Sequence, residues 1–160
     1  RILSSAASDV YKRQAQDFNN DGKKNIWTDT EDSLASIARY LQGVGSNKWD
    51  PNYTWGREVI PPANIKSLEP ELFIKREKGC LAIKKLSKQL PLSKFRLMNF
   101  KKMDGNSLDN LDINSYLLRM GREEGDFRYF IVYDNYLNIL SYNCSNYYGL
   151  SVGLLSDKFK

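Results

Sequence analysis

A short polar stretch with a fixed spacing of oxygen-bearing side chains constrains the fold of this chain more than any other feature. Asp17, Asn19 and Asp21 alternate with other residues and Gly22 follows, in the spacing D-x-N-x-D-G. This spacing is typical of an EF-hand-like calcium loop, in which the seventh residue, here Lys23, offers its backbone carbonyl. The pattern predicts one structural Ca²⁺. The alternative is an Asn/Asp-Gly turn without a metal.

The closing ligand of this loop departs from the EF-hand pattern. Thr28 stands at the twelfth position, where a bidentate Glu is usual. Because a threonine cannot clamp Ca²⁺ through two oxygens, a longer loop would have to bring Asp29, Glu31 or Asp32 to the metal. Glu31 has a competing role, since with Thr28 it makes a capping box for the next helix. Asp32 is therefore the expected last ligand.

Apolar periodicity predicts the elements that follow the loop. A repeat of three to four residues indicates a helix over 29–42. Residues 55–59 are expected to be extended, and residues 80–90 to form a lysine-rich amphipathic helix. In the tail, two β-prone runs around Asp134 and Asn135, at 129–133 and 136–140, predict a β-hairpin.

A closing helix is expected from Ser145 onward. Large apolar side chains such as Tyr148 and Leu155 line one of its faces, and others such as Tyr147 and Leu154 line a second face. The sequence therefore predicts a helix that is buried on two sides.

Composition excludes several classes of function. The chain has 160 residues, of which 41% are hydrophobic and 27% charged, as in a globular domain, and no apolar run is long enough to span a membrane. It contains no histidine, which excludes Ser-His-Asp and Cys-His catalysis and every histidine-containing zinc site within this chain. Cys80 and Cys144 are too few for a disulfide framework. They are expected to be two free thiols, with one disulfide as the alternative.

Residues 1–14 are interpreted as a non-native leader. The chain does not begin with Met, and RILSSAASDVYKRQ shows no clear period and resembles translated adapter read-through. The native domain is therefore taken as 15–160. Without the leader the net charge falls from +5 to +3, which is ordinary for a soluble surface. The lysine-rich region between Lys84 and Lys102 has few interleaved aromatic residues, so no nucleic-acid partner is expected.

Several motifs in order carry a resemblance to a known family. They are DFNNDGKKNIW at 17–27, EDSLASIARYL at 31–41, WGREV at 55–59, FIVY at 130–133 and YNCSNYYGLSVGLL at 142–155. Together they resemble the membrane-bound lytic murein transglycosylase B family of bacteria, from about residue 15 to residue 160.

The resemblance implies a fold, an activity and a location. The fold is α+β, a mainly helical lysozyme-like core with the calcium loop, a C-terminal β-hairpin and a helix. The activity is cleavage of the β-1,4 bond between N-acetylmuramic acid and N-acetylglucosamine to 1,6-anhydromuramyl products. The implied partner is the peptidoglycan glycan strand, and the implied location is the bacterial periplasm or the outer membrane.

The family's catalytic residue has no counterpart in this chain. The resemblance implies a single glutamic acid that acts first as acid and then as base, in a Glu-Ser/Thr-x-aromatic-Gly motif. No such motif occurs here, so no residue is assigned as catalytic. The chain is interpreted as the C-terminal part of the enzyme, inactive on its own.

The resemblance also assigns residues to the sugar-binding cleft. Tyr40, Tyr142, Asn143 and Tyr148 match family positions that line it. Tyrosine rings can stack on sugars while their hydroxyls form hydrogen bonds, and an amide side chain can bind an N-acetyl group. The alternative for each is a packing role.

A rival interpretation is a calcium-dependent, dockerin-like interaction module. A dockerin repeats its D-x-N-x-D-G loop about 20 residues on, as repeat arrays do. No second copy appears in this sequence.

Overall fold

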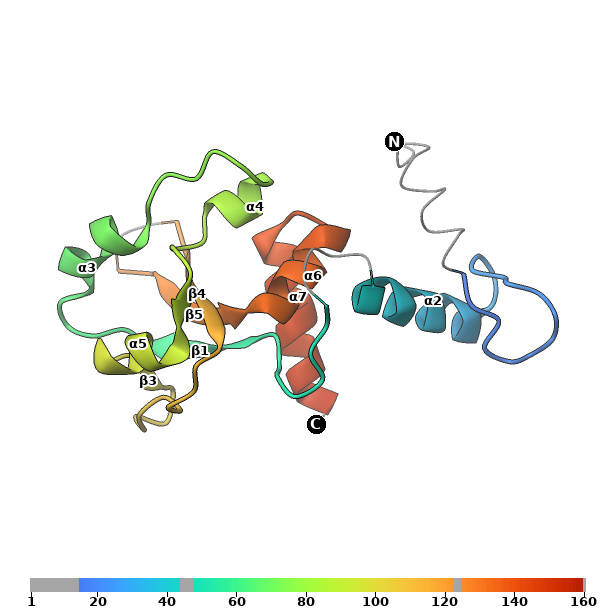
Figure 1. The fold of residues 1–160 in the computed structure, drawn as a ribbon, viewed down its shortest axis with the longest axis horizontal. Coiled ribbons are helices and arrows are strands. Elements are labelled where there is room, and N and C mark those ends of the chain that lie inside the picture. The colour runs from blue at the N-terminus through green and yellow to red at the C-terminus, as the bar shows by residue number, and fades with distance from the viewer. Residues whose placement is uncertain (1–14, 44–47, 123–124, 160) are drawn as a thin grey trace. The chain divides into compact units, whose positions relative to one another are not determined.

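The computed structural model describes residues 15–43, 48–122 and 125–159, so the interpreted leader 1–14 lies outside the described residues (Figure 1). The chain divides into two compact units, Arg1–Trp49 and Asp50–Lys160. Each unit is described by itself.

The first unit contains the polar loop and the helix α2, Thr30–Gly43, which confirms the helix expected over 29–42. Its cap differs from the expected Thr28–Glu31 box. The Asp29 carboxylate accepts hydrogen bonds from the backbone N–H groups of Glu31, at 2.9 Å, and Asp32, at 3.1 Å. Asp29 is the better cap because its ionised carboxylate also interacts favourably with the positive end of the helix dipole.

The second unit is built on a five-stranded antiparallel sheet in the order β2-β4-β5-β1-β3. The strands are β1 Gly56–Ile60, β2 Leu90–Pro91, β3 Lys101–Lys102, β4 Asn114–Met120 and β5 Arg128–Tyr133. Strand β1 confirms the extended segment expected at 55–59. The fold is α+β as expected, with mixed helices and a sheet.

One face of the sheet holds the main core. In the register, Leu117 lies opposite Ile131 and Val59 opposite Tyr129, so these side chains share a face. Buried residues of α3, Ile65–Leu72, and α5, Leu92–Leu97, pack against them in one hydrophobic cluster.

The expected hairpin at 136–140 is wrong. Residues Asp134–Tyr142 form helix α6, and the true hairpin pairs β4 with β5. The physical reason is that β5 is already paired along both edges, with β4 and with β1, so no edge remains for residues 136–140. The segment instead buries Tyr136, Ile139 and Leu140, a spacing of three and four that suits one face of a helix.

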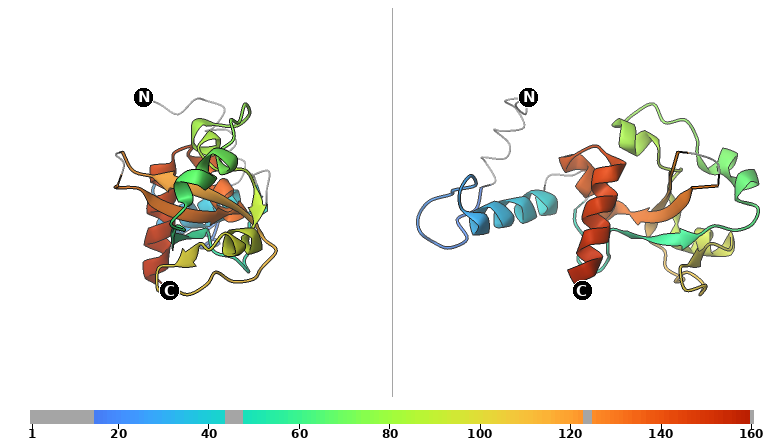
Figure 2. Two further views of the ribbon diagram at one scale, coloured as in Figure 1. Left: turned by 90° about the vertical axis from the view of Figure 1, so that its left-hand side faces the viewer. Right: turned by 180° about the vertical axis from the view of Figure 1, so that it is seen from behind.

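Helix α7, Asn146–Ser156, confirms the closing helix, followed by the 3₁₀ turn η1, Asp157–Phe159 (Figure 2). Its expected burial by large side chains on two sides is wrong. Tyr147 is 65% exposed and Leu155 59% exposed, while the buried residues are Asn146, Gly149, Leu150 and Gly153.

The buried face of α7 is narrow because two aromatic rings lie directly on its glycines. Atoms of the Tyr136 ring lie 2.8 Å from where a Cβ on Gly149 would stand, and a Cβ on Gly153 would clash with the Trp55 ring. Trp55 is 2% exposed, and its Nε1 donates to the Asp157 carboxylate at 3.1 Å. Glycine is therefore required at both positions for close approach.

The region expected as a helix over 80–90 is helical only at α4, Leu81–Lys84. After α4 the chain is extended, because Leu86 forms a β-bridge with Leu118 and the Ser87 hydroxyl accepts from the Leu117 backbone N–H at 2.8 Å. Cys80, the residue before α4, forms a disulfide with Cys144 across a Cα–Cα distance of 6.2 Å. The expectation of two free thiols is therefore corrected.

We predict that Gly153→Ala destabilises the protein by about 1–3 kcal/mol, the usual cost of adding a methyl group to a filled core. The Cβ has no room because the Trp55 ring occupies its place. Chemical denaturation measures the change. Ser151→Ala, on the exposed side of the same helix, is the matched control and should change stability by no more than about 0.5 kcal/mol. Equal stability of the two variants would contradict the packing argument.

Candidate functional site

Two tyrosines stack where α6 meets α7. Tyr142 ends α6 and Tyr148 lies in the first turn of α7. Their ring centroids are 6.1 Å apart and the ring planes differ by 24°. Tyr142 is 42% exposed and Tyr148 is half-buried. The pair therefore presents flat aromatic surface to solvent on a rigid junction between helices.

The turn that joins these helices is held by local hydrogen bonds. Ser145 caps α7 by accepting from the Tyr148 backbone N–H at 3.4 Å. The Ser145 backbone N–H donates to the Asn143 carbonyl at 2.7 Å. Asn143 itself is exposed in extended backbone, directly after Tyr142.

The environment of the pair changes the acidity of one ring. Burial, and secondarily the neighbouring Tyr142, raise the pKa of the Tyr148 hydroxyl above its ordinary value. Tyr148 therefore stays protonated, and able to donate a hydrogen bond, throughout the neutral range.

The structure brings together three of the four residues assigned to the sugar cleft. Tyr142, Asn143 and Tyr148 lie on the α6–α7 junction, and the rings of the two tyrosines are stacked. Tyr40 is half-buried on α2, in the other unit, so its place beside the pair stays a prediction. Stacked, partly exposed tyrosines with an adjacent amide suit a ring-shaped, hydroxylated ligand.

The predicted calcium loop is curled by its own side chains. The Asp17 carboxylate accepts from the backbone N–H groups of Asp21, at 3.1 Å, and Gly22, at 3.0 Å. Asn19 Oδ1 accepts from Asp21 N at 3.0 Å, and Asp21 Oδ1 from Lys23 N at 2.8 Å. Each of these three side chains therefore accepts a hydrogen bond from a backbone N–H group within the loop.

Asp32 closes the two ends of the loop. It is 1% exposed, and its two oxygens accept from the backbone N–H groups of Phe18 and Asn25, each at 2.8 Å. Asp29 Oδ2 accepts from the Asn19 side-chain amide at 2.9 Å. Within the described residues, no three His, Cys, Asp or Glu side chains converge as a metal-binding group. The calcium site therefore stays a prediction.

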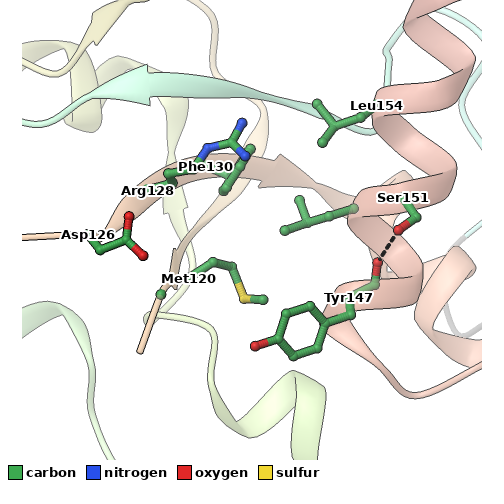
Figure 3. A pocket seen from close by; sticks show the side chains of 9 residues that line it. Met120, Asp126, Arg128, Phe130, Tyr147, Ser151 and Leu154 are labelled. Atoms are coloured by element: carbon green, nitrogen blue, oxygen red, sulfur yellow. Dashed lines mark hydrogen bonds between the residues drawn. The ribbon is translucent and has the colours of Figure 1, made fainter. Parts of the chain in front are cut away.

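A hollow that the sequence analysis missed lies between the sheet and α7 (Figure 3). Its volume is about 240 Å³. Arg128 stands on its rim, bound through two nitrogens to the Glu58 carboxylate at 2.7 Å each and stacked over the Phe130 ring at 5.2 Å. In the sequence, the alternation of Arg128 and Phe130 along one strand was the signal that pointed to this hollow. The lining residues are Met120, Gly121, Asp126, Arg128, Phe130, Tyr147, Leu150, Ser151 and Leu154.

Comparison with known proteins identifies a family. A family model described as the transglycosylase SLT domain matches residues 8–157. No curated protein gives a significant match. Among the parts of the chain that the structure describes, no helix is both long and apolar enough to cross a membrane.

Solved structures with the same fold include several lytic transglycosylases. SltB3 from Pseudomonas aeruginosa, in complex with NAG-anhNAM-pentapeptide, is 32% identical with a TM-score of 0.72, over 94% of this chain and 36% of that chain. Soluble lytic transglycosylase SltB1 from the same organism is 20% identical, with a TM-score of 0.61, over 93% and 43%. Escherichia coli Slt35, in complex with calcium, is 23% identical, with a TM-score of 0.62, over 93% and 40%.

These likenesses confirm the expected lysozyme-like lytic transglycosylase fold, with mixed helices and a sheet. The chain spans well under half of the length of each of these three relatives.

We predict that Tyr148 ionises at a higher pH than an ordinary tyrosine and that Tyr142→Phe lowers its pKa part of the way back. Burial remains in this variant, and only the contribution of the neighbouring hydroxyl is lost. The pKa of Tyr148 is higher in the folded than in the unfolded state. Its contribution to the free energy of unfolding is therefore complete below the unfolded pKa of about 10 and is lost as the pH rises through the folded pKa. Titration of the tyrosine ¹³Cζ resonances measures this. Tyr53→Phe is the control, and an equal effect of both variants would contradict the assignment.

Proposed function

The chain belongs to the transglycosylase SLT domain family, and from this premise we propose that it forms the glycan-binding part of a peptidoglycan lytic transglycosylase. The family match bears out the resemblance to the lytic murein transglycosylase B family. The observation that carries the proposal is the stacked, partly exposed pair Tyr142–Tyr148. The family model matches both the polar loop and the C-terminal tail of this chain. A dockerin-like module does not account for the match to the tail.

The proposed substrate is the glycan strand of peptidoglycan. SltB3 was solved with NAG-NAM-pentapeptide and with NAG-anhNAM-pentapeptide, the latter an anhydro sugar. For this chain we propose the same chemistry, cleavage of the MurNAc–GlcNAc β-1,4 bond with closure to a 1,6-anhydro product. In this proposal Tyr40, Tyr142 and Tyr148 stack on sugar rings, and Asn143 binds an N-acetyl group.

We also propose that the catalytic acid lies outside these 160 residues. Two glutamates, Glu58 on β1 and Glu69 on α3, are already engaged. Both oxygens of Glu58 accept from Arg128, and Glu69 accepts from Arg119 at 2.7 Å and from the Tyr129 hydroxyl at 2.8 Å. The remaining glutamates are Glu31, Glu71, Glu77, Glu123 and Glu124. None stands in the family's motif.

Calcium is proposed as a structural ion of the loop. The donor set consists of oxygens from Asp17, Asn19, Asp21, the Lys23 carbonyl and Asp32, which is the chemistry that Ca²⁺ prefers. Asp32 supports the fit, since its buried carboxylate meets two backbone N–H groups and no Lys or Arg ion pair among the described residues. A buried carboxylate of this kind gains from a nearby cation.

A periplasmic or outer-membrane location is proposed on two grounds. The family acts on peptidoglycan, and the chain carries the disulfide Cys80–Cys144. Disulfides persist in oxidising compartments such as the bacterial periplasm.

We predict that this chain alone releases no anhydromuropeptides from purified sacculi, and that fusion to an upstream family segment carrying the glutamate restores release. Loss of a general acid costs about 10²–10⁴ in rate. In the fusion, Tyr148→Ala should lower activity, whereas Tyr53→Ala, outside the pair, should not. Mass spectrometry of the products is the measurement. Anhydro products from the unfused chain would show that a glutamate within it, Glu58 or Glu31 first, is catalytic.

We predict that Ca²⁺ raises the melting temperature of the chain and that Asp21→Ala abolishes the rise. A ligand at one hundred times its Kd stabilises the folded state by about 2.7 kcal/mol. Asp104→Ala is the matched control, because Asp104 accepts from Asn106 N at 2.9 Å in a similar turn far along the chain. Scanning calorimetry with Ca²⁺ and with chelator measures the shift. The same melting temperature in both buffers for the wild type would refute the site.

A further inference from the structure

The α4 turn is attached to the α6–α7 junction at two points. The first is covalent, since Cys80, the residue before α4, forms a disulfide with Cys144 in the turn between the helices. The sulfur of Cys144 also accepts from the Ala82 backbone N–H at 3.4 Å. This link joins residues that are 64 positions apart in the sequence.

The second attachment point is Asn146, the first residue of α7. It is 6% exposed, and its side-chain amide donates to the Ala82 carbonyl at 3.0 Å. Its Oδ1 and its backbone carbonyl both accept from the Tyr136 hydroxyl at 3.2 Å. Ala82 is therefore bound through its N–H by Cys144 and through its carbonyl by Asn146.

These attachment points flank the stacked tyrosines in the sequence. Tyr142 precedes Cys144 by two residues, and Tyr148 follows Asn146 by two. The rings come from two different helices, so their mutual orientation depends on the turn 143–145 that joins the helices. The contact between the rings is too weak to fix this arrangement by itself, because a pair of aromatic rings contributes only about 0.5–1.5 kcal/mol beyond its buried area.

We infer that the α4 turn is a clamp that positions the Tyr142–Tyr148 pair for glycan binding, with the Cys80–Cys144 disulfide and the Asn146–Ala82 hydrogen bond as its attachment points. The inference rests on the proposed function for the identity of the ligand. The geometry of the clamp stands independently of it. The clamp residues do not contact sugar. They act by fixing the two rings in the stacked arrangement before the ligand arrives, which removes an ordering cost from binding.

The test compares C80S/C144S, which removes the covalent link without leaving a free thiol, with Asn146→Ala. The second variant removes the link to Ala82 and also one of the two oxygens that accept from the Tyr136 hydroxyl, whose bond to the Asn146 backbone carbonyl remains. The probe ligand is a peptide-free tetrasaccharide of alternating GlcNAc and MurNAc, titrated against the whole chain. The first readout is the nuclear Overhauser effect between the Tyr142 and Tyr148 rings in tyrosine-labelled protein, which reports their proximity without ligand. The second is the Kd for the tetrasaccharide.

Both variants should weaken the ring-to-ring signal and raise the Kd. If the stacked arrangement falls to about a tenth of the molecules, the Kd rises about tenfold. Leu92→Ala is the matched control for general destabilisation. Leu92 is fully buried in the main core cluster, whose buried members include no residue of α6 or α7. This control should lower the melting temperature while leaving the ring signal and the Kd as in the wild type.

The possible outcomes separate the clamp from the proposed function. A wild-type ring signal in both variants overturns the clamp, and so does an equal loss of signal in Leu92→Ala. Should C80S/C144S fail to fold, Asn146→Ala with wild-type signal still overturns it. A wild-type chain that shows the ring signal but does not bind the tetrasaccharide overturns the glycan assignment, while loss of that signal in the variants still supports the clamp.

Discussion

The contact of two aromatic rings with a glycine face is the interaction on which the second unit depends. Trp55 precedes β1, Tyr136 belongs to α6, and both pack where Gly153 and Gly149 leave α7 without side chains. Their close approach joins the start of the sheet to both C-terminal helices. Asn135 completes the junction, since its side chain accepts from Asp50 N and donates to the Asp50 and Tyr53 carbonyls, each at 2.8 Å. The oxygen and the nitrogen of this buried amide are both used in hydrogen bonds, which fixes the segment that leads into β1.

Local signals in the sequence predicted the parts of the fold that depend on local physics. The periodicity after the loop predicted α2, and the closing helix expected from Ser145 onward is α7, with Ser145 as its cap. The failures share a cause, because each depended on partners distant in sequence. Residues 136–140 have β-prone side chains, but both edges of β5 were already occupied. The periodicity of large side chains does not reveal the buried face of α7, because Gly149 and Gly153, four positions apart, mark that face.

The candidate site was predictable to the extent that it lies in one stretch of chain. Tyr142, Asn143 and Tyr148 came from a motif, and the structure places them on one junction. The pairing of Cys80 with Cys144 could not be derived, because it requires the approach of two segments that only the folded sheet and helices bring together. The role of Asp32 in closing the loop was foreseen only as a metal ligand. Its bonds to Phe18 and Asn25 show that this carboxylate also organises the backbone.

The outer strands of the sheet have a consequence for self-association. Strands β2 and β3 stand at the two ends of the strand order, and each spans only two residues. One contains Pro91, which has no N–H to donate, and the other consists of Lys101 and Lys102. Short edges bearing proline or like charges resist the addition of a strand from a second molecule. Strand β5 is paired along both of its edges, and the two end strands are poor partners for a second molecule, which disfavours self-association through the sheet.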